Sequence, residues 1–81
     1  MPQPRKSAFS PPYREIIERL IARRRELDMT QIDLAAAYGE DQSFISRVER
    51  RQRRIDVYEF VRFCRALDLE PGKVLANLPE S

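Results

Sequence analysis

Four polar side chains near the middle of the chain have the types and the spacing to form specific hydrogen bonds together. They occur at i, i+1, i+4 and i+5, a spacing that an α-helix brings to one face, and they are Gln42, Ser43, Ser46 and Arg47. Glutamine can pair with adenine, arginine with guanine and serine with either base, and each good bidentate pair gives about 1–3 kcal/mol of discrimination. The same residue types are common on any protein surface, so the element that carries them decides between the two interpretations.

A run of arginines overlaps and follows these four residues. Residues 47–54 read RVERRQRR, with five arginines against one glutamate. Such a run binds nucleic-acid phosphates with an affinity that falls as salt rises, or it is only a solvated loop. Phosphate contact is favoured where the run follows a projecting helix, and the candidates are then Arg50, Arg51, Arg53 and Arg54.

Apolar spacing and capping residues predict the helices that position these side chains. A first helix starts near Pro11 or Pro12, because proline is tolerated in a first turn, and Ser10 is a possible N-cap. It ends near residue 27 or 28. Its apolar face recurs at helical spacing and consists of Ile16, Ile17, Leu20, Ile21 and Leu27.

A second and a third helix follow with a very short connection. Thr30 and Asp33 resemble a capping box at the start of the second helix, and Gly39 stands where a left-handed terminating residue is needed. Asp41 is a good N-cap for the third helix. The side chains predicted to face inward are Leu34, Ala35, Tyr38, Ile45 and Val48, with Phe44 beside them.

Two more helices complete an all-α fold of five helices. A fourth starts after Asp56, with Glu59 three residues on as a second box-like cap. Its predicted buried stripe is Val57, Phe60, Val61, Cys64 and Leu67. A short fifth helix starts at Pro71, with an apolar side formed by Val74, Leu75 and Leu78. No strand pattern and no internal repeat are visible.

The short connection around Gly39 predicts a helix-turn-helix. Helices joined by about three residues cross at a steep angle, and the small side chain of Ala35 permits close packing between them. With Ile45 and Val48 turned inward, the third helix projects and presents Gln42 to the outside. A helix about 10–12 Å across fits the major groove of DNA, which is about 12 Å wide.

Composition excludes several other classes of protein. The chain has 81 residues, which fit one domain, and a net charge of +2. It contains no histidine and a single cysteine, Cys64, so we expect no disulfide, metal site, cofactor or histidine catalysis. Asp33, Glu40 and Asp41 are better explained as caps than as a catalytic carboxylate pair, so we predict no enzyme. No signal peptide or membrane span is visible, and the predicted location is the cytoplasm.

Residues 16–78 resemble the lambda-repressor-like domain, the Cro/C1-type helix-turn-helix of the XRE family. The strongest similarity is TQIDLAAAYGEDQSFISRVER, residues 30–50. The resemblance implies a phosphate contact for Gln31 and base contacts for Gln42, Ser43, Ser46 and Arg47, with the later arginines near the DNA backbone. Two positions depart from the family pattern: Arg51 stands where a glycine is frequent, and Ile55 where a proline is frequent.

The resemblance further implies a transcriptional repressor or autoregulator that reads a palindromic operator as a homodimer. We expect residues 1–10 to form a basic, flexible arm and residues 11–81 the DNA-binding domain. The alternative is a protein-interaction module, such as an antitoxin that binds its toxin and contacts DNA only secondarily. For the dimer surface we expect the fifth helix and the end of the fourth, because their apolar residues exceed what a small core needs: Phe63, Val74, Leu75 and Leu78.

Overall fold

The structure is a computed structural model that describes residues 10–80 of the chain. These residues form five α-helices and no strand: α1 (Pro11–Glu26), α2 (Gln31–Tyr38), α3 (Gln42–Glu49), α4 (Val57–Ala66) and α5 (Pro71–Leu75). The predicted all-α, five-helix fold is therefore confirmed. The predicted N-terminal arm lies outside the described residues, except for Ser10.

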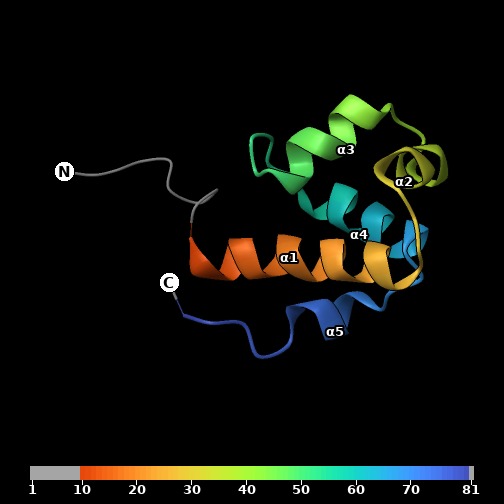
Figure 1. Cartoon of the computed structure of the whole chain (residues 1–81). Helices are drawn as coiled ribbons and strands as arrows, with labels where there is room; N and C mark the ends of the chain where they lie inside the picture. Colours follow the sequence, from red (N-terminus) through yellow and green to blue (C-terminus); the bar gives the residue numbers. More distant parts are fainter. Residues whose placement is uncertain (1–9, 81) are drawn as a thin grey trace.

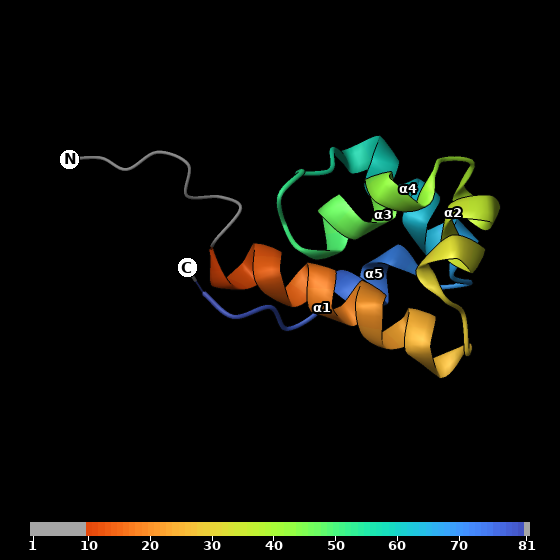
Figure 2. The same cartoon turned by 45° about the horizontal axis from the view of Figure 1, so that its top comes forward.

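Helix α1 runs through the middle of the molecule and separates α5 from α2 and α3 (Figure 1). In that view α2 is seen almost along its axis whereas α3 runs across the picture, so the two helices cross at a steep angle. The turned view in Figure 2 shows α3 in front of α4, joined to it by a long loop that bulges away from α2. The arrangement places α3 at one edge of the bundle and α5 at the opposite edge.

Side-chain caps start four of the helices, as the sequence predicts. Thr30 accepts the backbone N–H of Asp33 at 3.0 Å while the Asp33 carboxylate accepts that of Thr30 at 2.9 Å. The same reciprocal box joins Asp56 and Glu59 at 2.7 and 2.9 Å. Simple N-caps at Ser10 and Asp41 begin α1 and α3. Each cap satisfies a backbone donor that the first turn leaves free.

Gly39 ends α2 in the left-handed conformation, with φ of +96°. Its N–H donates to the Ala35 carbonyl at 2.8 Å, and the N–H of Glu40 donates to the same oxygen at 3.1 Å. A side chain is strained at this φ, so glycine is the residue that permits so tight a turn into α3. The predicted helix-turn-helix connection is confirmed.

The core collects buried side chains from all five helices around three aromatic rings. The rings of Tyr38 and Phe63 are 4.5 Å apart between centroids, and those of Tyr38 and Phe44 are 5.3 Å apart. Cys64 is fully buried in this core, as predicted, and burial raises the pKa of its thiol. The remaining buried apolar residues are Ile17, Leu20, Leu34, Ala35, Ile45, Val48, Leu67 and Val74.

For two residues the prediction of a buried position is wrong. Val57 is 80% exposed, because it is the first residue of α4 and this turn extends past the edge of the core. Leu27 is 38% exposed, because α1 ends one residue earlier and Leu27 is already its C-cap. Helical spacing predicts which face of a helix is apolar. It does not predict how much of that face the neighbouring helices cover.

Two of the four residues expected at the dimer surface lie in the core instead. Phe63 is 1% exposed and Val74 is 3% exposed, so both belong to the core of the single chain. Helix α5 ends at Leu75, and Leu78 lies beyond it and is half-buried. Of the four residues, only Leu75 is exposed, at 46%.

Arginines of α1 hold the C-terminal part of the chain against the bundle. Arg19 donates to the carbonyl oxygens of Val74 at 2.8 Å and Ala76 at 2.6 Å. Arg23 donates through Nε to the carbonyl of Leu67 at 3.0 Å, at the end of α4. Helix ends leave carbonyls without partners, so these arginines complete the hydrogen bonding of α4 and α5.

Candidate nucleic-acid interface

Helix α3 buries one flank and leaves the other open, as the sequence predicts. Ile45 and Val48 are 0% and 1% exposed. Gln42, Ser43 and Arg47 are exposed on the opposite flank, and Ser46 is half-buried. We call the surface formed by Gln42, Ser43, Ser46 and Arg47 the polar flank of α3.

One internal hydrogen bond orders two side chains of the polar flank. The guanidinium of Arg47 donates from Nη1 to the Ser43 Oγ at 2.9 Å, four residues back along the helix. Arginine carries five N–H donors, so this contact leaves most of them for a partner. The bond therefore directs the guanidinium along the flank without using up its capacity.

A glutamine pair links the polar flank to α2. The side-chain amide of Gln42 donates to the Gln31 Oε1 at 2.7 Å, and the Gln31 amide donates to Glu49 Oε1 at 2.9 Å. The two hydrogen bonds therefore run in the same direction, from the amide of Gln42 to Gln31 and from the amide of Gln31 to Glu49. Among the described residues no hydrogen bond reaches the Gln42 carbonyl oxygen, so Gln42 retains the acceptor and a second N–H that adenine requires.

Glu49 is the anchor of this chain of hydrogen bonds. Its carboxylate accepts two bonds from Arg24, 2.7 Å from Nε and 3.1 Å from Nη2, and the two side chains are each 10% exposed. Arg24 also donates to the Met29 carbonyl at 2.8 Å. A paired, hydrogen-bonded and buried ion pair is geometrically rigid, so Arg24 in α1 fixes Gln31 in α2 through a residue of α3.

Sequence reasoning missed this ion pair, although two signals pointed to it. Arg24 follows Ile17 and Leu20 at helical spacing, so it lies on the apolar stripe of α1 and needs a partner there. Glu49 is the single acid in the arginine run. A charged residue on a buried stripe and a lone residue of opposite sign elsewhere are natural partners.

The end of α3 is a left-handed turn built without glycine. Arg51 has φ of +59°, and its N–H donates to the Val48 carbonyl at 2.9 Å while the N–H of Gln52 donates to that of Arg47 at 2.8 Å. These two bonds define a Schellman motif. The loop therefore keeps the backbone geometry that a glycine would give, with an arginine side chain at the turn.

The arginines after α3 differ in their surroundings. Arg50 is exposed, and Arg51 is half-buried with its Nε enclosed and without a hydrogen-bond partner among residues 10–80. Arg53 donates to Glu59 at 2.7 Å and lies 4.8 Å from the centre of the Phe44 ring. Arg54 is exposed, and its guanidinium lies 6.0 Å from the centre of the Tyr13 ring.

The Arg53–Glu59 pair ties the loop to α4. The hydrogen bond from Arg53 holds the pKa of the Glu59 carboxyl below its ordinary value of 4.5, and the hydrogen bond from the Asp56 backbone lowers it further. The pKa of Arg53 is raised by the same contact. Arg53 therefore stabilises the fold of the loop and also adds to its positive charge.

Other kinds of site find no support within residues 10–80. No group of three or more His, Cys, Asp or Glu side chains is arranged to hold a metal ion in this part of the chain. None of its helices has the length and apolar character needed to cross a bilayer. Asp33 and Asp41 act as caps, as the sequence predicts.

The steep crossing of α2 and α3 and the outward position of α3 define a helix-turn-helix fold. The helix-turn-helix family matches residues 20–74, a segment that begins in α1, contains α2, α3 and α4 entire, and ends in α5. The chain therefore belongs to this family, of the Cro/C1 or XRE type, and is a DNA-binding transcriptional regulator. No curated protein sequence matches the chain.

Proposed function

We propose that the protein is a sequence-specific repressor or autoregulator that reads a palindromic operator through the major groove as a homodimer. The observation that carries the proposal is the polar flank of α3, exposed at the edge of the bundle and fixed from behind by the Arg24–Glu49 pair. Preorganised side chains lose little conformational entropy on binding. The flank is therefore suited to specific rather than only electrostatic recognition.

The base contacts follow from the donors and acceptors of the flank. Gln42 presents an amide N–H and an oxygen, the pair that recognises adenine, and Arg47 presents the fork that recognises guanine. Ser43 and Ser46 donate or accept and are compatible with several bases. Each good bidentate contact contributes about 1–3 kcal/mol of discrimination.

The phosphate contacts surround the flank on two elements. Gln31 lies at the first position of α2, where backbone N–H groups are free and a phosphate binds readily. Arg50 and Arg54 are exposed on the loop and neutralise phosphates directly. Arg51 and Arg53 contribute their charge from half-buried positions, and Arg53 shares its charge with Glu59.

Dimeric binding explains how so small a domain reaches useful affinity. Two copies related by a two-fold axis place two α3 helices in successive major grooves, about 34 Å apart along the DNA. Each copy reads one half of a palindrome, so the operator mirrors the symmetry of the protein. A regulator of this kind works where the genome is, which in a bacterium is the cytoplasm.

The experiment is selection of binding sites from a pool of random duplex DNA, followed by gel shifts over a series of salt concentrations. We expect one palindromic site whose affinity falls by about 0.9 log units per log unit of salt for each phosphate contacted. Enrichment of no sequence, with weak binding to all duplexes alike, contradicts the proposal. That outcome favours a module that binds another protein.

A further inference from the structure

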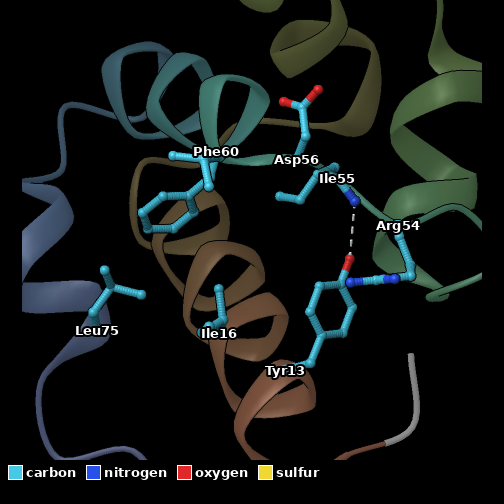
Figure 3. A pocket seen from close by; sticks show the side chains of 8 residues that line it. Tyr13, Ile16, Arg54, Ile55, Asp56, Phe60 and Leu75 are labelled. Atoms are coloured by element: carbon cyan, nitrogen blue, oxygen red, sulfur yellow. Dashed lines mark hydrogen bonds between the residues drawn. The ribbon is translucent and has the colours of Figure 1, made fainter. Parts of the chain in front are cut away.

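An apolar pocket opens where the first turn of α1, the start of α4 and α5 meet. Figure 3 shows Ile16 from α1, Phe60 from α4 and Leu75 from α5 converging on it, with Tyr13 and Ile55 at the end nearer the loop. Its volume is about 220 Å³. The backbone N–H of Ile55 donates to the Tyr13 hydroxyl at 3.2 Å, so the wall at this end is fixed.

Two of the apolar side chains that line the pocket are also exposed to solvent. Val57 lines the pocket and is 80% exposed, and Leu75 on the α5 side is 46% exposed. Clustered exposed apolar side chains beside a hollow mark an interaction surface, whereas isolated ones do not.

The rim also carries two opposite charges. Arg54 and Asp56 flank Ile55 and both line the pocket. Neither forms an ion pair within residues 10–80, although the Asp56 Oδ1 accepts the N–H of Glu59 as the cap of α4. Each side chain therefore has a charge to offer to a partner.

We propose that this pocket is the surface through which a second copy of the chain docks, with Val57 of the partner subunit entering the pocket and Arg54 pairing with Asp56 of the partner subunit. The inference deepens the proposed function and rests on it for its role on DNA. A two-fold interface is isologous: if residue i contacts residue j of the other copy, the reverse contact also forms. The surface is complementary to itself, because the exposed Val57 lies beside the pocket and Arg54 lies two residues from Asp56.

The size of the pocket favours side chains of a second copy over a small-molecule ligand. An apolar cavity of about 150 Å³ holds one benzene molecule, and ligand sites in proteins usually measure about 300–1,000 Å³. At about 220 Å³ the pocket holds one or two aliphatic side chains. Its rim also carries equal numbers of opposite charges, which suits a copy of itself better than a partner of one sign.

This interface leaves the polar flank of α3 open. The pocket is lined from α1, α5, the 54–56 loop and the start of α4, and no residue of α3 takes part. The loop that follows α3 then lies at the two-fold axis, so the contact sets the spacing between the two α3 helices. Arg54 has five N–H donors, enough to serve both the partner and a phosphate.

The test is sedimentation of the full chain without DNA, comparing Val57→Asp with Ile32→Asp. Ile32 is 67% exposed on α2 and does not line the pocket, so the control places the same charge on another exposed apolar position. We expect Val57→Asp to weaken dimerisation by about 100-fold or more, because it brings like charges together in the interface. We expect Ile32→Asp to dimerise like the unaltered chain. Equal dimerisation constants for the two variants overturn the proposal.

A charge exchange gives a second and independent readout. Arg54→Asp and Asp56→Arg are each expected to be monomeric alone, and their equimolar mixture is expected to restore the dimer. Circular dichroism checks that Asp56→Arg still folds without its cap. A mixture that stays monomeric although both variants fold overturns the pairing, as does an unaltered chain that is monomeric at micromolar concentration and on a duplex with two half-sites.

The two proposals fail in different ways. Sedimentation uses no DNA, so its result tests the interface whatever sequence the protein binds. On DNA, Val57→Asp is expected to bind an isolated half-site like the unaltered chain and to lose only the cooperative gain on a full palindrome. A loss of half-site affinity contradicts the separation of the interface from the polar flank.

Discussion

Glu49 shows how one residue can serve stability and recognition at once. Its carboxylate neutralises the buried guanidinium of Arg24 and at the same time orients Gln31, whose oxygen receives Gln42. A carboxylate can accept several hydrogen bonds, and here three donors from two helices use that capacity. Gln42, which we propose reads a base, is thus held in place through a residue at the other end of α3.

Replacement of Glu49 by alanine is expected to destabilise the fold strongly. The change leaves Arg24 buried without its counter-charge, and breaking a buried pair in this way costs about 3–5 kcal/mol. The measurement is the free energy of unfolding in urea. The matched control is Glu26→Ala, which removes an exposed partner of Arg23 and is expected to cost less than about 1 kcal/mol. Similar losses in the two variants contradict the assignment of the buried pair.

Arg51 carries a backbone strain that a glycine at this position would relieve. A non-glycine residue in the left-handed region costs about 1–2 kcal/mol, and Arg51 has φ of +59°. Arg51→Gly is therefore expected to raise the free energy of unfolding by about 0.5–1 kcal/mol, after the greater flexibility of glycine in the unfolded chain is deducted.

Arg50→Gly is the matched control for this substitution. It removes the same charge one residue earlier, but Arg50 has φ of −88°, where glycine brings no relief. We expect Arg50→Gly to lower the stability, while both variants weaken DNA binding. Equal stability changes in a denaturant titration contradict the role of the positive φ.

At the scale of the helices, what the sequence predicts well is local. The caps at Thr30, Asp41 and Asp56 and the turn at Gly39 depend on hydrogen bonds that span at most five residues, so residue types alone reveal them. The exposure of Val57 and the burial of Phe63 depend on where the other helices lie. The Gln42–Gln31–Glu49 chain joins α2 to α3 and is anchored by Arg24 of α1, and no local signal fixes that geometry.

The connection from α3 to α4 is expected to respond to acid through Glu59. Arg53 keeps the pKa of this carboxyl in the folded state below its ordinary value of 4.5, so the pair stabilises the fold above that pH. The contribution is lost as the pH falls from 4.5 through the lowered pKa. Because Arg53 is 40% exposed, the effect is discounted to below about 1 kcal/mol.

Glu59→Gln isolates this contribution, because the amide oxygen can still accept the Asp56 N–H and preserve the cap. The difference in unfolding free energy between the unaltered chain and the variant is expected to shrink as the pH is lowered through this range. Arg53→Ala should show the same loss of pH dependence. Parallel curves for the unaltered chain and Glu59→Gln argue against the pair.

At the scale of the whole molecule, charge is distributed unevenly along the chain. The net charge is only +2, yet residues 47–54 hold five arginines and one glutamate. Residues 55–81 hold three basic and five acidic residues. We expect phosphates to attract the arginine-rich segment and to repel the acidic segment, so that α3 approaches the groove first.

Family membership and the five-helix fold could be predicted from the sequence, because helical periodicity and the turn signature are strong over residues 30–50. The identity of the base-reading residues stays a prediction, since neither the fold nor the family fixes which bases they contact. Two of the four residues expected at the dimer surface, Phe63 and Val74, are core residues, because exposed and buried apolar side chains look alike in the sequence.

The most direct test of base reading by α3 is to repeat the selection from random DNA with Arg47→Ala. The control is Arg65→Ala, which removes an exposed arginine from α4, outside the polar flank. We predict that Arg47→Ala loses its preference at one position in each half-site, with a discrimination of about 1–3 kcal/mol disappearing there, while Arg65→Ala selects the original site. Selection of an unchanged site by Arg47→Ala would contradict the role of the polar flank in reading sequence.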